Sequence, residues 1–128
     1  MSAPNFVGDD GLITVKLDHN VARRIGAGGE SLHAPHLIDL EVVSVVRGLE
    51  ARAAVSSGGA ARALADLVAL DLARYPHDTL VPRIWQLRGN LTPYDAAYVA
   101  LGELLAAPVI TCDRRLAAAP GHRARFEV

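Results

Sequence analysis

The sequence is poor in cysteine and in aromatic residues: the chain of 128 residues has one cysteine, Cys112, and aromatic residues make up 5% of it. A single cysteine excludes an intramolecular disulfide and a cysteine-based metal site. The apolar runs are far too short to cross a bilayer. Residues 1–11 also lack the basic and apolar regions of a secretory signal. We therefore expect a soluble, cytoplasmic protein that makes no contact with a membrane.

Neither sign of charge dominates, because the chain has 13 lysine and arginine residues and 14 aspartate and glutamate residues. A strongly basic chain would suggest nucleic acid by itself, so any such partner must here be recognised by a local site. The length suits one domain, which we assign to residues 1–128. Hydrophobic residues make up 51% of the chain, and many of them are alanine, which favours a core of closely packed helices.

Strand-like and helix-like segments alternate along the chain. Short apolar or β-branched runs predict strands at 32–36, 71–75, 108–112 and 123–128. Apolar spacing predicts helices at about 38–54, 59–70, 79–87 and 93–106. In the first of these helices the regularly spaced apolar residues are Leu40, Val43, Val46 and Leu49. This alternation predicts a three-layer α/β/α domain with a mostly parallel sheet.

Three acidic residues occupy positions from which a common site can form. Glu41 is predicted in the first turn of the 38–54 helix, Asp95 in the first turn of the 93–106 helix, and Asp113 at the carboxyl end of a strand. Sites in parallel sheets form outside these carboxyl ends. Gathered carboxylates repel one another unless a divalent cation such as Mg²⁺ binds them. Such an ion can activate a water, which indicates metal-assisted hydrolysis of a phosphodiester.

Each candidate also has a purely structural interpretation. Acids in a first turn complement the helix dipole, and Thr92-x-x-Asp95 is itself a capping pattern. Asp113 could simply open a turn after its strand. Arg114 and Arg115 could bind a phosphate or begin a solvated helix. Spacing alone leaves these alternatives open.

The aromatic and histidine residues add no second site. Trp85, Tyr94 and Tyr98 are interpreted as core or interface residues and not as base-stacking platforms. The histidines lack the spacing of a zinc site on one helix. Cys112 lies in an apolar strand, which is typical of a buried, inert thiol.

Three stretches of the sequence together resemble a known family. They read LHAPHLIDLEVVSVVR (32–47), RYPHDTLVPRIWQLRGNLTPYDAAYVALGELL (74–105) and PVITCDRRLAAAPG (108–121). Their order and spacing are similar to those of VapC toxins, the PIN-domain nucleases of toxin–antitoxin pairs. The resemblance covers residues 32–128, whereas residues 1–31 are atypical.

The resemblance implies a PIN-like fold and a metal-dependent ribonuclease that cuts RNA with Mg²⁺ or Mn²⁺. By position in the motifs, the metal-binding and catalytic acids would be Glu41, Asp95 and Asp113. Thr92, Thr111 and Asn90 would support them. The implied partners are an antitoxin protein, an RNA substrate and a second copy of the chain. The alternative is a catalytically silent domain that binds its antitoxin or dimerises without cleaving RNA.

The sequence departs from the family at its start, where members usually have a hydrophobic strand that ends in a catalytic aspartate. Residues 12–17 could be this strand, with Asp18 as a fourth metal ligand, but only thirteen residues then separate Asp18 from Leu32. Alternatively, residues 18–25 form the helix before the 32–36 strand and the true first strand is lost. We prefer the second explanation, because VARRIGAGGESLHAP is typical of a helix end followed by a loop.

Overall fold

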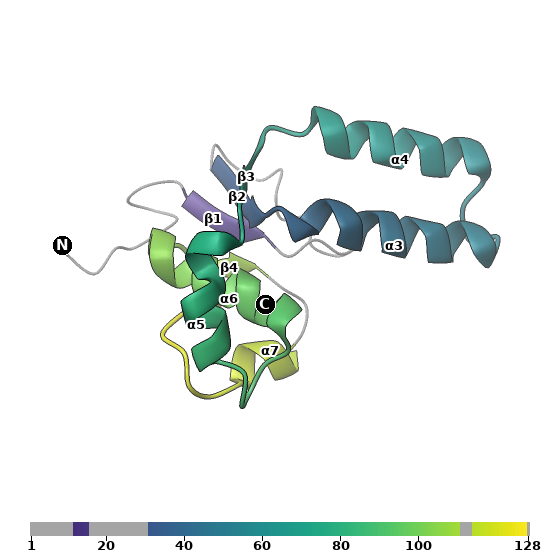
Figure 1. Ribbon diagram of the computed structural model, residues 1–128. Helices are drawn as coiled ribbons and strands as arrows, with labels where there is room; N and C mark the ends of the chain where they lie inside the picture. Colours follow the sequence, from purple (N-terminus) through teal and green to yellow (C-terminus); the bar gives the residue numbers. More distant parts are fainter. Residues whose placement is uncertain (1–11, 16–30, 111–113, 128) are drawn as a thin grey trace.

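The computed structural model describes residues 12–15, 31–110 and 114–127 (Figure 1). The strands are β1 (Leu12–Val15), β2 (Ser31–Pro35), β3 (Leu72–Tyr75), β4 (Val109–Ile110) and β5 (Phe126–Glu127). The helices are α3 (Leu37–Ala51), α4 (Ser57–Ala69), η1 (Asp78–Leu80), α5 (Val81–Gln86), α6 (Pro93–Leu105) and α7 (Arg114–Ala118). The predicted α/β class is confirmed.

The five strands form one sheet in the order β3-β2-β1-β4-β5, and each neighbouring pair is parallel. The central strand β1 pairs Ile13 with Leu32 of β2 on one side and Val15 with Ile110 of β4 on the other. Because all the strands run the same way, their carboxyl ends lie at one edge of the sheet. The carboxyl ends of β1 and β4 and the start of α3, which follows β2, therefore lie at the same edge.

The preferred explanation of the N-terminus, a lost first strand, is wrong. Residues 12–15 form the central strand, as the LITV pattern of β-branched and apolar residues favours. A parallel crossover needs about a dozen residues, and residues 16–30 supply fifteen between β1 and β2. The connection is therefore long enough for β1 and β2 to pair in parallel. The helix predicted at 18–25 lies outside the described residues.

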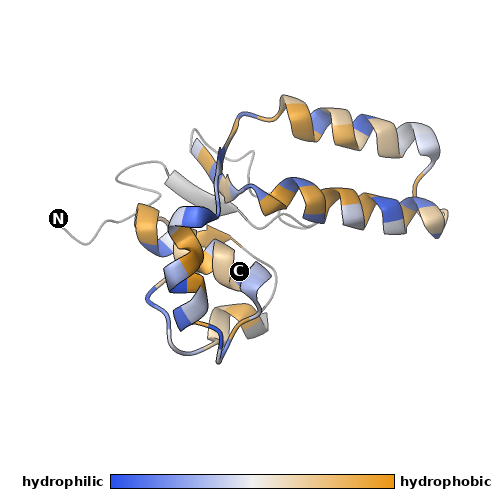
Figure 2. Ribbon diagram, viewed as in Figure 1, coloured by the Kyte–Doolittle hydropathy of each residue, from blue (hydrophilic) through white to orange (hydrophobic). Residues whose placement is uncertain are grey.

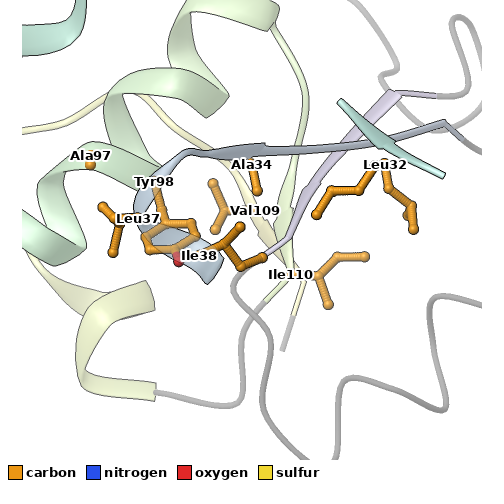
Figure 3. Close-up of a cluster of buried hydrophobic side chains, with 9 residues drawn as sticks. Leu32, Ala34, Leu37, Ile38, Ala97, Tyr98, Val109 and Ile110 are labelled. Atoms are coloured by element: carbon orange, nitrogen blue, oxygen red, sulfur yellow. The ribbon is translucent and has the colours of Figure 1, made fainter. Parts of the chain in front are cut away.

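Helix α6 forms the centre of the core. All residues from Ala96 to Gly102 are buried. Ala97 and Tyr98 pack with the apolar residues of β2, β4 and α3 (Figure 3). Ala96 and Val99 pack with Leu87, Leu91 and Leu116, and Ala100 and Leu101 pack with Leu80. Between Ala96 and Gly102 the helix is covered on all sides, which explains why this stretch of its sequence is apolar without a polar face.

Gly102 sets the distance between α6 and β4. A Cβ atom at this position would lie 2.7 Å from Cγ2 of Val109 and 3.2 Å from the carbonyl oxygen of Ala107. Only glycine fits without displacing strand β4, so the helix can approach the sheet closely at this point.

Helices α3 and α4 form a hairpin that extends away from the sheet (Figure 1). Val46, Ala60 and Leu67 are buried within it, whereas Leu40 is 75% exposed and Val43 is also exposed. The regular spacing correctly predicted the helix, but it did not identify its buried face, because the outer part of α3 packs mainly on α4. Figure 2 shows apolar residues along both helices of this hairpin. None of the helices in the described ranges is long and apolar enough to span a membrane.

Candidate metal and nuclease site

Helix α3 carries two acids in its motif LIDLEV, and the structure gives them different surroundings. The helix begins at Leu37, whose backbone N–H donates to Nε2 of His77 at 3.1 Å. Asp39 is therefore the acid of the first turn, and Glu41 lies in the second turn. The prediction that Glu41 lies in the first turn was wrong, because the helix starts one residue earlier than its apolar spacing indicated.

Asp39 is committed to a structural ion pair. The Nε atom of Arg74 lies 3.0 Å from Oδ1 and 2.9 Å from Oδ2 of Asp39. The same guanidinium donates to the carbonyl oxygens of Leu67 and Leu72. Arg74 thus joins the start of α3, the end of α4 and strand β3. Sequence reasoning missed this pair, because no local pattern links residues 35 positions apart.

Glu41 contacts the buried core residue Tyr98. The Tyr98 hydroxyl donates to Oε1 of Glu41 at 2.5 Å, and the Tyr98 side chain is completely buried. Within the described part of the chain, Oε2 of Glu41 makes no hydrogen bond. The contact joins α3 to α6 and fixes one of the two carboxylate oxygens.

Asp95 lies in the first turn of α6, directly after the predicted cap. Thr92 is the N-cap, and its Oγ1 accepts a hydrogen bond from the backbone N–H of Asp95 at 3.2 Å. Pro93 occupies the first turn, where a missing N–H is tolerated. The cap uses the backbone amide of Asp95 and not its carboxylate. The capping role of Thr92 and a metal-binding role of Asp95 are therefore compatible.

The pKa of the Tyr98 hydroxyl responds to burial and to the acids of α3 and α6. Burial, the hydrogen bond to Glu41, and the negative charges of Glu41, Asp95 and Asp39 all raise the pKa of Tyr98. The hydroxyl is accordingly a permanent donor to Glu41 in the usual pH range. The hydrogen bond to Glu41 thus links α3 to the helix that carries Asp95.

The other candidates lie elsewhere or outside the described residues. Asp18, Thr111, Cys112 and Asp113 are among the residues that the structure does not describe. Arg114 and Arg115 begin α7. The amide of Asn90 lies against Gly121, whose φ of +92° favours glycine. In residues 12–15, 31–110 and 114–127, no three histidine, cysteine or acidic residues form a group that could hold a metal ion.

The aromatic residues divide into two groups. Tyr98 is a core residue, as predicted, whereas Trp85 and Tyr94 are each 65% exposed. Of the two predicted alternatives, core or interface, this exposure excludes the core for Trp85 and Tyr94, and an interface role for them stays a prediction. The guanidinium of Arg88 lies 4.2 Å above the Trp85 ring, a distance typical of a cation–π contact.

The chain is similar to three named ribonucleases of Mycobacterium tuberculosis. It is 38% identical to ribonuclease VapC12 over 117 residues, which is 91% of this chain and 89% of that protein. It is 43% identical to ribonuclease VapC9 over 100 residues, or 78% of each chain. It is 48% identical to ribonuclease VapC1 over 90 residues, covering 70% and 68% of the two chains.

The chain belongs to the VapC ribonuclease family. No protein-family model matches it. The segment 32–128 has 97 residues, so the match to VapC12 over 117 residues must include residues before Leu32. The N-terminal part is thus also related to VapC12, in agreement with the position of β1 at the centre of the sheet.

A solved structure of low sequence identity has a similar fold. The crystal structure of PAE2754 from Pyrobaculum aerophilum matches 98% of this chain and 92% of its own, with a TM-score of 0.67 and 20% identity. The likeness confirms the predicted PIN-like α/β/α architecture with a parallel sheet.

Proposed function

We propose that this VapC protein is a metal-dependent endoribonuclease, the toxin of a type II toxin–antitoxin module. Glu41, Asp95 and Asp113 are its proposed metal-binding and catalytic residues. The observation that carries the proposal is the hydrogen bond from Tyr98 to Glu41, because it joins α3, which carries Glu41, to α6, which carries Asp95 one turn before Tyr98. The names of the relatives, each a ribonuclease, supply the substrate class.

The residues fit a divalent cation. Glu41 and Asp95 are partly exposed, so solvent and a hydrated ion can reach them. Carboxylate oxygens are the donors that Mg²⁺ and Mn²⁺ prefer. Asp39 is already neutralised by Arg74, so we do not assign it to the metal. The LIDLEV motif therefore contributes Glu41 and not Asp39.

A fourth acid, Asp18, follows the central strand. Strand β1 ends at Val15, so Asp18 comes three residues after a carboxyl end of the sheet. Asp113 likewise comes three residues after the end of β4. These equivalent positions support Asp18 as a further ligand. The silent-domain alternative would lack this fourth carboxylate, so a metal-binding role of Asp18 argues against it.

The chain's own residues would orient the reaction. Tyr98 holds Glu41, and the Thr92 cap fixes the first turn that carries Asp95. Arg114 and Arg115, at the start of α7, are proposed to bind phosphate oxygens. A bound cation supplies charge neutralisation and a more acidic water. Without it, the gathered carboxylates repel the phosphates of RNA.

The remaining assignments follow from the family. We propose Mg²⁺ or Mn²⁺ as the cofactor, a cognate antitoxin and RNA as partners, a homodimer, and the cytoplasm as the location. We also propose that residues 1–128 form one domain.

A calorimetric titration with Mn²⁺ tests the site directly. We expect saturable binding by the unchanged protein and at least about tenfold weaker binding by Asp95→Asn. Asp71→Asn is the matched control, because Asp71 is exposed and precedes β3 at the opposite edge of the sheet. The control should bind like the unchanged protein and should cleave a single-stranded RNA in a manner that EDTA stops. Failure of the folded, unchanged protein to bind Mn²⁺ would exclude the proposal.

A further inference from the structure

Tyr98 places a polar group in a part of the core where an apolar side chain would fill the same space. Its ring is completely buried and packs with Leu37, Ile38 and Val109 (Figure 3). A phenylalanine would make the same apolar contacts. Burying a hydroxyl costs free energy unless it is hydrogen-bonded. The hydroxyl of Tyr98 therefore calls for a role beyond packing.

The hydrogen-bond partner of the Tyr98 hydroxyl indicates what this role is. The hydroxyl donates to Oε1 of Glu41, the residue from the LIDLEV motif. Tyr98 also follows Asp95 by three positions on α6, so the two residues are neighbours on one side of the helix. A single side chain thus connects the helix that carries Asp95 to the carboxylate on α3.

We propose that Tyr98 is a positioning residue for the metal site: its hydroxyl holds one oxygen of Glu41 and leaves the other for the cation. This inference rests on the proposed function. A free glutamate side chain has several rotamers, and ordering it on metal binding costs conformational entropy. The hydrogen bond from the rigid, buried ring orders the carboxylate in advance. Residues that orient metal ligands in this way typically change metal affinity by about 10- to 100-fold when they are removed.

The variant Tyr98→Phe tests the inference, because it removes the hydroxyl and keeps the ring volume. We expect the Mn²⁺ affinity in calorimetry to fall about tenfold. The Mg²⁺ concentration for half-maximal RNA cleavage should rise by a similar factor. At saturating metal, kcat should return close to that of the unchanged protein, since no reacting group has been removed.

Tyr75→Phe is a matched control. The Tyr75 hydroxyl is also hydrogen-bonded, to Nδ1 of His33 at 2.5 Å, but its partner is no acid. This control loses an aromatic hydroxyl and its bond and should keep the Mn²⁺ affinity of the unchanged protein. In a Glu41→Gln background, Tyr98→Phe should cause no further loss of Mn²⁺ affinity, because the oriented carboxylate is already gone.

The outcomes separate the inference from the proposed function. Unchanged Mn²⁺ affinity in Tyr98→Phe, with normal binding by the parent protein, would overturn the positioning role and leave the nuclease proposal intact. An equal loss in Tyr75→Phe would also overturn it, since it would reveal general loosening of the fold. Failure of the parent protein to bind Mn²⁺ would overturn both.

Discussion

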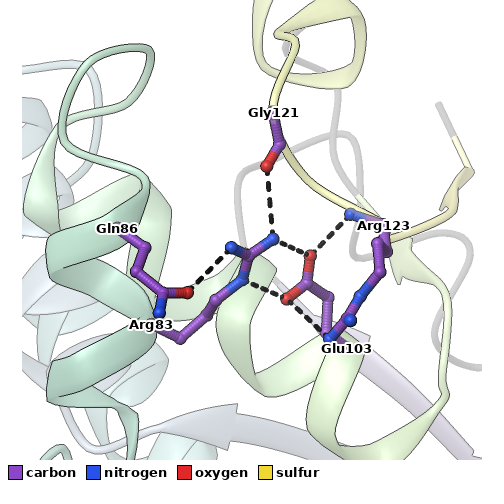
Figure 4. Close-up of polar contacts among 5 residues, drawn as sticks. All are labelled: Arg83, Gln86, Glu103, Gly121 and Arg123. Atoms are coloured by element: carbon purple, nitrogen blue, oxygen red, sulfur yellow. Dashed lines mark hydrogen bonds and ion pairs between the residues drawn. The ribbon is translucent and has the colours of Figure 1, made fainter.

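Arg83 and Glu103 form a bidentate ion pair that anchors the C-terminal part of the chain. Nε and Nη2 of Arg83 lie 2.7 Å and 3.0 Å from Oε1 and Oε2 of Glu103, whose side chain is only 4% exposed (Figure 4). Glu103 also accepts from the backbone N–H of Arg123 at 2.6 Å, and Arg83 donates to the carbonyl oxygen of Gly121. These bonds fix the segment that leads into β5 against α5 and α6.

The Arg83–Glu103 pair predicts a specific loss of stability in acid. Burial alone would raise the pKa of Glu103, but the hydrogen bonds from Arg83 and Arg123 outweigh it and lower the pKa. A carboxyl with a lowered folded-state pKa stabilises the fold above its unfolded-state pKa, and this stability is lost as the pH falls through the folded-state value. Glu103→Gln should therefore lose about 2 kcal/mol at pH 7, since it removes the charged partner of Arg83, which keeps its hydrogen bonds to Gln86 and Gly121.

Urea unfolding between pH 7 and pH 3 checks this expectation. The difference in unfolding free energy between the parent protein and Glu103→Gln should shrink as the pH falls below about 4.5. Glu50→Gln is the control, because Glu50 is exposed on α3. A difference that stays constant over this range would show that the charge of Glu103 contributes nothing.

Gly102 predicts an exception to the usual effect of alanine in helices. Replacing a helical glycine by alanine normally stabilises by about 0.5–1 kcal/mol. At Gly102 the new Cβ would lie 2.7 Å from Val109, so Gly102→Ala should destabilise by about 1–3 kcal/mol. At Gly48 of α3 the nearest atom would be 3.6 Å away, so Gly48→Ala should show the normal gain. Thermal unfolding measures the change in stability of both variants. A change in the same direction for Gly102→Ala and Gly48→Ala would contradict the close packing of Gly102 on Val109.

Local patterns in the sequence predicted most of the secondary structure. Thr92 and Pro93 correctly identified the start of α6, and LITV was recognised as a possible strand. The short connection between this strand and Leu32 argues against it by comparison with the family. Here the local β-propensity was the better guide, since a parallel crossover can be as short as about a dozen residues.

The candidate site could be predicted only in part. Glu41 and Asp95 lie in recognisable motifs, but their surroundings depend on residues distant in the sequence. Tyr98 is 57 residues from Glu41 and Arg74 is 35 residues from Asp39. No periodicity relates such pairs, so the choice between the two acids of LIDLEV needed the three-dimensional structure.

The two acids of that motif should respond differently to removal of their charge. Asp39→Asn removes the charge that Nε of Arg74 contacts and should cost about 1–2 kcal/mol, a moderate value because both side chains are partly exposed. Its Mn²⁺ affinity should stay within about twofold of the parent value, whereas Glu41→Gln should lose at least about tenfold. Urea unfolding and calorimetry on both variants test the assignment. An exchange of the two effects would assign the metal to Asp39.

His33 predicts a second pH dependence, in a different range. It is a buried residue of β2, with Nε2 2.9 Å from Oγ of Ser31 and Nδ1 2.5 Å from the Tyr75 hydroxyl. Burial lowers the pKa of His33 from its ordinary value of 6.5. The unfolded chain therefore takes up the proton first as the pH falls, and protons favour unfolding. The neutral ring contributes fully to the unfolding free energy above pH 6.5. This contribution declines as the pH falls below 6.5 toward the folded-state pKa.

In His33→Gln, the unfolding free energy should fall less between pH 7.5 and pH 5.5 than in the parent protein, because the variant has no titrating ring at this position. The exposed residue His36 provides the control variant, His36→Gln, which should keep the decline of the parent protein. Urea titrations at the two pH values measure both slopes. If His33→Gln and the parent protein decline equally, the buried ring does not control stability in this range, and titration elsewhere in the chain must account for it.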